Sequence, residues 1–255
     1  QDRIGYLIHD YVYCVLQIQP KVFVLENVPQ LAPKGFGQSE SPIFELAVER
    51  LRRHGYLANF KVLSATDYGV AQKRKRLFLV GVRPDIAKRV QINNEQTILE
   101  ECYPEPTVRN LTLRDVLKNV EIDQQERQML LTVTVNSSRK ELVSLLPKNP
   151  HKVIRLKDVD KTIKGNFSLE RWCWGMPART VTQMGVQLPR ANYFHPDEDR
   201  PFTVNELRRV MGVPDDFVLT GSYNQKVERL GRMVPPLMTA ALANRLYERI
   251  LKRTR

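Results

Sequence analysis

The 255-residue sequence contains little cysteine: Cys14, Cys102 and Cys173 are its three. Their odd number and wide spacing fit neither a disulfide framework nor a metal site, so we expect reduced thiols and a cytoplasmic protein. The sequence also lacks an apolar run long enough to span a bilayer, and it lacks a signal peptide. These absences argue against a membrane protein and a secreted one.

Acidic residues are scarce relative to basic ones. Lys and Arg total 40 against 28 Asp and Glu, which gives a formal net charge of +12. A field of this sign attracts polyanions, with nucleic acid the first expectation and an anionic membrane the second. The 42% hydrophobic content is enough for a buried core in one large or two modest domains.

Apolar patterns in the first 86 residues predict half of an α/β domain. A helical stripe covers 2–19, and a nearly continuous apolar run at 21–25 predicts a strand buried on both faces, which ends at Glu26. Open α/β sheets place their sites at such strand ends. A second helix, begun by Ser41-Pro42 and stopped at Gly55, and strands at 57–64 and 77–82 complete this half.

The pattern weakens between 87 and 170, which predicts a separate, smaller domain. It mixes a helical pattern at 112–120 with strand-like runs at 131–135 and 153–156. Order returns with a capping box at 203–206 and an amphipathic stretch at 236–251.

Three separated strings carry a family resemblance. They are Phe23-Val24-Leu25-Glu26-Asn27-Val28, the run from Ala65 to Phe78, and His195-Pro196 through Pro235-Pro236. In this order they resemble the late motifs of cytosine-5 DNA methyltransferases. The resemblance implies the C-terminal part of a Rossmann-like, S-adenosylmethionine-dependent methyltransferase sheet plus a smaller mixed target-recognition domain. The implied segments are 1–86 (second half of the catalytic domain), 87–178 (target recognition) and 179–255 (late motifs and a C-terminal helix returning to the catalytic domain).

The resemblance gives Glu26 a catalytic role. In this family a cysteine thiolate adds to C6 of a flipped-out cytosine, so that C5 can attack the methyl donor. A carboxyl group in a partly apolar pocket, with a raised pKa, can support that step through N3 of the ring. For an isolated Glu-Asn-Val string, an ordinary helix-capping acid would be the better interpretation.

The basic string 72–76 is expected near the target base. By resemblance Arg76 contacts the base and Arg74 supports it, while Gln72 and Lys73 lie closer to the DNA backbone. The alternative is a solvated basic turn.

Arg179 and Thr180 resemble the family's ninth motif, which touches DNA backbone; His195, in the same motif, is expected to be structural. The recognition region should hold the base readers. The candidates are Arg155, Lys157, Lys161, Lys164, Asn166 and Arg171, of which Lys161 and Lys164 are our main choices for DNA contact.

Asn27, Gly231, Arg232 and Val234 are assigned to the S-adenosylmethionine site by resemblance. The last motif usually reads Gly-Asn-Ala-Val-Pro-Pro, whereas this chain has Gly231-Arg232-Met233-Val234-Pro235-Pro236. Arg232 would either repel the donor's sulfonium, reach its carboxylate or turn to solvent. Met211 likewise stands where the family usually has Gln. No metal is expected.

The family's early motifs, with the Gly-containing cofactor loop and the Pro-Cys-Gln nucleophile, are absent from this sequence. We expect that duplex DNA and a complementing N-terminal methyltransferase subunit or segment are its partners, as in a split enzyme or a fragment of a longer one. A non-catalytic DNA-binding relative and an RNA cytosine methyltransferase are the alternatives. A restriction-modification role fits the family, although neighbouring genes would decide it.

Overall fold

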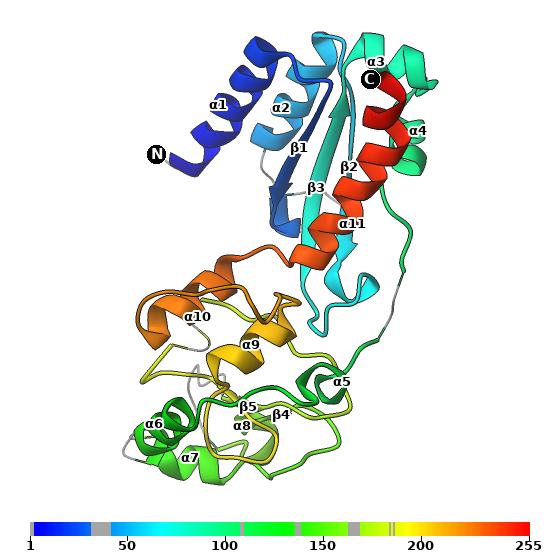
Figure 1. Ribbon diagram of the computed structural model, residues 1–255. Coiled ribbons are helices and arrows are strands. Elements are labelled where there is room, and N and C mark those ends of the chain that lie inside the picture. Colours follow the sequence, from blue (N-terminus) through cyan, green and yellow to red (C-terminus); the bar gives the residue numbers. More distant parts are fainter. Residues whose placement is uncertain are drawn as a thin grey trace. The chain divides into compact units, whose positions relative to one another are not determined.

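A computed structural model describes residues 3–31, 42–107, 110–135, 139–162, 169–183, 185 and 187–255 (Figure 1). The chain forms two compact units. The first unit comprises Gln1–Ser64, Lys75–Pro106 and Thr239–Arg255, and the second comprises Ala65–Arg74 and Thr107–Met238. The roles expected for segments 1–86, 87–178 and 179–255 stay predictions, because these units are defined by packing alone.

The first unit is built on a three-stranded sheet with the order β1-β3-β2. The strands are β1 (Val22–Asn27), β2 (Leu57–Ser64) and β3 (Lys75–Val82). Both pairings are antiparallel, so the parallel pairing typical of a Rossmann sheet is not seen among these strands. The central strand is the apolar one, since it is buried from Leu77 to Val82.

Helices pack on the sheet because each presents an apolar stripe to it. Helices α1 (Arg3–Ile18) and α2 (Pro42–Arg53) share a core with β1 and β3 that contains Val12, Phe44 and Leu79. Figure 1 shows α4 (Glu95–Glu101) and the C-terminal part of α11 (Pro236–Leu246) beside the same sheet. The apolar sequence of β1 predicted a strand buried on both faces. This prediction is wrong, because Val24 is 37% exposed.

The second unit contains short elements around an aromatic core. Trp172 and Phe202 are fully buried with Leu207, Val227 and Leu230. Its helices are α5 (Leu113–Leu117), α6 (Gln124–Val135), α7 (Lys140–Ser144), α8 (Leu156–Val159), α9 (Val204–Val210) and α10 (Tyr223–Arg232), and its strands are β4 (Ile154–Arg155), β5 (Glu170–Arg171) and β6 (Tyr193–Phe194).

The sequence predicted a helix start correctly where a side chain caps the helix. The capping box predicted at 203–206 is confirmed, because Thr203 and Glu206 bond reciprocally at the start of α9. The strand predicted at 131–135 is wrong, because these residues form the last turns of α6. Their β-branched side chains favour a strand only where a sheet neighbour is available.

The remaining elements are short or terminal: α3 (Pro84–Val90), the 3-10 turns Pro29–Leu31, Ala65–Asp67 and Lys252–Thr254, and a π-helical turn at Tyr247–Leu251. Among the residues that the structure describes, none of the helices has the length and apolarity needed to cross a membrane.

Candidate functional site

Glu26 and Arg76 form an ion pair in the first unit. The antiparallel register sets Glu26 opposite Phe78, so the end of β1 lies beside the start of β3, where Arg76 stands. Arg76 Nε is 2.9 Å from Glu26 Oε1, with the two side chains 14% and 31% exposed. Two residues that are far apart in sequence are thereby joined where β1 ends and β3 begins.

The pair combines a half-buried acid with a half-buried cation. Burial lowers the pKa of Arg76, and the charge and hydrogen bond of Glu26 oppose this effect. An apolar pocket was expected around Glu26, whereas its neighbour here is a cation. An acceptor and a donor side by side can bind the alternating donors and acceptors on the polar edge of a planar ring.

Arg74 lies in the second unit and is almost completely buried. Its Nη1 donates to the Val181 carbonyl at 2.9 Å and its Nη2 to the Gly231 carbonyl at 3.0 Å. The guanidinium therefore holds two distant segments together, which fits the supporting role predicted for it and leaves no surface for a base.

Gln72 is also buried in the second unit. Its Oε1 accepts the Val181 N–H at 3.3 Å, and its Nε2 lies 2.7 Å from Met211 Sδ. Met211 is the residue that, by the resemblance noted in the sequence, stands where a Gln was expected. This burial argues against the predicted contact of Gln72 with DNA, because the amide is used inside the unit.

Lys73, Arg179 and Thr180 lie on two paired segments. The Lys73 N–H donates to the Ala178 carbonyl at 2.8 Å, and the Thr180 hydroxyl donates to the Lys73 carbonyl at 2.7 Å. The Lys73 side chain is exposed, and that of Arg179 is 41% exposed. Lys73 thus presents its charge to solvent, as a phosphate contact requires, while Arg179 is partly exposed and pairs with the Glu170 carboxylate at 3.2 Å.

The predicted base readers differ in their surroundings. Lys157 and Lys161 are exposed, and Arg155 is partly exposed. Arg171 is fully buried, and it donates to the carbonyls of Val143, Leu146, His195 and Glu198 and to Asp199. Arg171 is therefore wrong as a base reader. Lys164 and Asn166 lie outside the described residues.

His195 is buried, in keeping with the structural role expected for it. Its Nδ1 accepts the Asp197 N–H at 3.2 Å, and its Nε2 lies 3.5 Å from Glu206 Oε1. Burial lowers the pKa of His195, which favours the neutral ring.

The residues assigned to the methyl donor have mixed surroundings. Asn27 Oδ1 accepts the Val28 N–H at 2.8 Å. Arg232, on α10, is paired with Glu228 at 2.7 Å and donates to Gln183 at 2.6 Å. Its charge is therefore partly neutralised, which weakens the predicted repulsion of a sulfonium. Gly231 is buried and Val234 partly buried.

Comparison with known proteins decides the family. The model of the C-5 cytosine-specific DNA methylase family matches residues 1–248. The chain belongs to this family. It is 27% identical to the type II methyltransferase M.Eco47II of Escherichia coli, covering 99% of this chain and 60% of that protein. It is also 27% identical to M.Sau96I of Staphylococcus aureus, covering 92% of this chain and 52% of that protein.

The methylase-family chain thus spans 52% to 60% of the length of these relatives. Solved structures agree on the fold. A prophage-encoded DNA modification methyltransferase candidate of E. coli matches with a TM-score of 0.65 at 18% identity, over 99% of this chain and 76% of that one. The Dnmt2 methyltransferase of S. pombe matches with a TM-score of 0.54 at 16% identity, over 90% and 68%.

The cysteines of this methylase-family chain differ in exposure. Burial raises the pKa of Cys102 to about 12, and burial also raises that of Cys173. Cys14 is exposed on α1. A buried thiol with a raised pKa is a poor nucleophile, so burial argues against Cys102 and Cys173 as nucleophiles.

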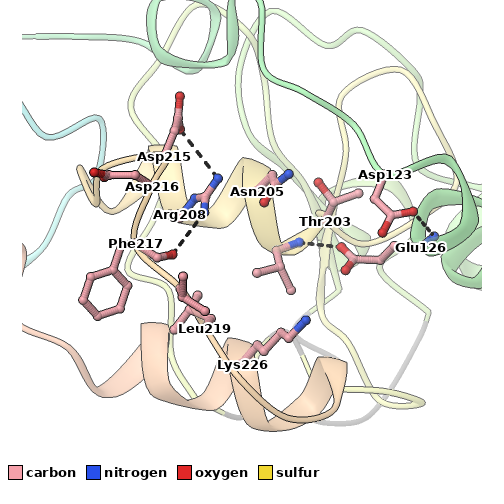
Figure 2. A pocket seen from close by; sticks show the side chains of 12 residues that line it. Asp123, Glu126, Thr203, Asn205, Arg208, Asp215, Asp216, Phe217, Leu219 and Lys226 are labelled. Carbon is pink, nitrogen blue, oxygen red and sulfur yellow. Dashed lines mark hydrogen bonds and ion pairs between the residues drawn. The ribbon is translucent and has the colours of Figure 1, made fainter.

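A pocket of about 280 Å³ in the second unit was not predicted from the sequence (Figure 2). It lies among the starts of α6 and α9 and the middle of α10. In Figure 2 the Glu126 carboxylate accepts the Val204 N–H, at 2.6 Å, and Lys226 projects from α10. Burial raises the pKa of Glu126. Its lining residues come from segments separated by up to a hundred positions, which no local pattern reveals.

Proposed function

We propose that this chain takes part in methylation of cytosine at C5 in duplex DNA. The Glu26–Arg76 pair carries the proposal, because it joins a carboxylate and a guanidinium at a strand end of a chain whose family acts on cytosine. The type II methyltransferases among its relatives favour DNA as the substrate and restriction-modification as the setting.

The pair is proposed to hold a flipped-out cytosine by its polar edge. Arg76 donates to the O2 carbonyl oxygen, and Glu26 bonds at N3 and the neighbouring amino group. These contacts replace part of the ion pair. In the absence of the base, the ion pair keeps both side chains in place. By stabilising charge that moves onto the ring, they make addition at C6 easier.

S-adenosylmethionine is the proposed donor, and it supplies an electrophilic methyl group. Asn27, Gly231, Arg232 and Val234 are proposed to line part of its site. The pairing of Arg232 with Glu228 makes this assignment compatible with a cationic sulfonium. Further donor contacts are proposed to come from a complementing N-terminal segment or subunit.

The nucleophilic thiolate is proposed to come from the same complementing part. Cys102 and Cys173 are buried, and Cys14 lies on the exposed part of a helix without the Pro-Cys-Gln context. Exposed apolar side chains in the first unit, including Leu7, Ile18 and Val28, offer a surface for that part.

DNA is proposed to contact the outward cations. Lys73, Arg179 and Lys161 are the described members of this group, with Thr180 ordering the backbone of Lys73. Arg74 and Gln72 are proposed to support these cations from inside the second unit, through their hydrogen bonds to its backbone. Lys164 belongs to the same proposal on sequence grounds alone.

A methyl-transfer assay with labelled donor tests the proposal. Mixed-sequence duplex DNA is offered to the chain alone and to the chain co-purified with its complementing part. Glu26→Gln is expected to lower the transfer rate by at least about 100-fold while duplex binding stays within about two-fold. Glu100→Gln, which removes an exposed carboxylate of α4, is the matched control.

Transfer only in the presence of the complementing part supports a split enzyme. Tight duplex binding without transfer in either preparation would replace the proposal with a non-catalytic DNA-binding module. Transfer to RNA but not to duplex DNA would replace it with an RNA methyltransferase.

A further inference from the structure

A single buried carboxylate in the second unit is shared by two arginines. Glu170, on β5, has a side chain that is only 6% exposed. Its Oε2 lies 3.2 Å from Arg179 Nη1 and 4.0 Å from Arg155 Nε. Its Oε1 accepts the indole N–H of Trp172 at 2.9 Å. Because Trp172 is fully buried, this bond fixes the direction of the carboxylate.

The sheet fixes the position of Arg155 as well. Arg155 stands directly opposite Glu170 in the antiparallel pairing of β4 with β5. It faces the carboxylate through Nε, the inner nitrogen of the guanidinium. The two terminal nitrogens have no hydrogen-bond partner among the described residues, and the side chain is 42% exposed. Arg179 differs, since a terminal nitrogen of its guanidinium is the atom that meets Glu170.

Arg155 Nε and the Glu170 carboxylate are 4.0 Å apart, which is an ion pair without a hydrogen bond, and the terminal fork of the guanidinium is not occupied by that carboxylate. That fork matches two neighbouring acceptors, and among the four bases guanine offers such a pair, O6 and N7, on its major-groove edge. A phosphate contact needs less, because an arginine on a flexible stem reaches a phosphate without a buried carboxylate behind it. The arrangement therefore suits the reading of a base better than the binding of backbone.

We propose that Arg155 reads a guanine in the DNA sequence that this chain recognises, and that Glu170, its partner across the β4–β5 pairing, is the positioning residue that orients its guanidinium by charge. This inference rests on the proposed function as a DNA methyltransferase and adds which base is read and by which residues. Arg179, held by the same carboxylate, contributes a charge beside that base. Glu170 compensates one of the two positive charges, so the arginines can lie close together.

Selection from a random-sequence duplex library tests the inference, using the full chain with its complementing part. Arg155→Lys keeps the charge but removes the fork. It is expected to lower the preference for guanine at one position by about ten-fold or more, while binding to bulk DNA stays within about three-fold. Glu170→Gln keeps an acceptor for Trp172 but loses the charge, and it should relax the same position. Lys140→Gln, an exposed cation of α7, should leave the preference unchanged.

Thermal unfolding of each variant separates specificity from folding. A Glu170→Gln variant that melts earlier yet selects the wild-type sequence would overturn the positioning role. An Arg155→Lys variant that weakens every sequence equally would make Arg155 a phosphate contact and overturn the inference, as would a wild-type motif without guanine. If the wild-type chain selects no DNA sequence at all, the proposed function fails along with the inference.

Discussion

Arg74 and Gly231 are 157 positions apart in sequence, and a hydrogen bond of 3.0 Å from the Arg74 guanidinium to the Gly231 carbonyl joins them. The second terminal nitrogen of Arg74 bonds to the Val181 carbonyl. One basic residue thus connects the backbone at Val181 to the backbone at Gly231. The buried Arg74 guanidinium therefore fixes backbone within the second unit.

Arg74→Ala is expected to destabilise the chain by about 3 kcal/mol, because two buried carbonyls lose a charged donor. The free energy of unfolding in urea measures this loss. Lys75→Ala, which removes an exposed neighbouring cation, should change the same quantity by less than about 0.5 kcal/mol. Equal losses in the two variants would contradict the role given to Arg74.

Gly231→Ala should destabilise by about 1–3 kcal/mol, since an added methyl group meets rigid backbone. The new Cβ would stand 2.5 Å from the Gln183 nitrogen and 2.7 Å from the Thr182 carbonyl carbon. Gly175→Ala is a matched control, because a Cβ there has nothing within 4 Å. Melting temperatures of both variants provide the comparison, and a stable Gly231→Ala protein would refute the packing described here.

Stability should fall as the pH drops below about 6.5, the ordinary pKa of histidine. Burial lowers the pKa of His195, so the unfolded chain takes up a proton before the folded one does. The stabilisation is complete above the unfolded pKa and is lost as pH falls toward the folded pKa. The neighbouring charges do not cancel this effect, although Glu206, Glu198 and Asp197 oppose it.

Urea unfolding at several pH values from about 7.5 to about 5.5 measures the slope. Glu198 stays ionised throughout, because hydrogen bonds from Arg200 and Arg127 lower its pKa against the effect of burial. His195→Gln should flatten the dependence, whereas His54→Gln, which changes an exposed residue just after α2, should leave it intact. An unchanged slope in His195→Gln would assign the dependence to other groups.

Thiol reactivity should separate the three cysteines. Cys14 is exposed, while Cys102 and Cys173 are buried. An aromatic disulfide reagent should modify one thiol in the native chain and three after unfolding in guanidinium. Cys14→Ser should abolish the native reaction. Rapid native modification of Cys173 would show that its surroundings are open.

Much of the first unit could be predicted from sequence because its elements carry strong periodic patterns. Strand β2 agrees with its predicted range, and β3 begins two residues earlier than predicted. The difference places Arg76 inside the strand, where pairing with β1 brings it to Glu26. The apolar run at 77–82 does not reveal the true start of β3. Lys75 and Arg76 are charged, so they lie outside the apolar run, yet they belong to the strand.

Burial of charged residues was the less predictable part. Arg171, Gln72 and Arg74 look like surface residues in sequence, yet each is buried and hydrogen-bonded to distant backbone. The ion pairs of Glu170 with Arg155 and Arg179 could not be predicted for the same reason, since the three residues come from β5, β4 and a later segment. Only the fold brings such partners together, and the family resemblance identified motifs without their contacts.

The strands β4, β5 and β6 are each two residues long, so their ladder alone holds little of the second unit together. Arg171 supplies what the ladder lacks, since its one guanidinium binds four backbone carbonyls and a carboxylate. The surrounding loops are thereby anchored at a point rather than along their length. A transplant of new loops into the second unit should therefore keep Arg171 and the backbone around it, while the outward-facing residues of those loops remain open to redesign.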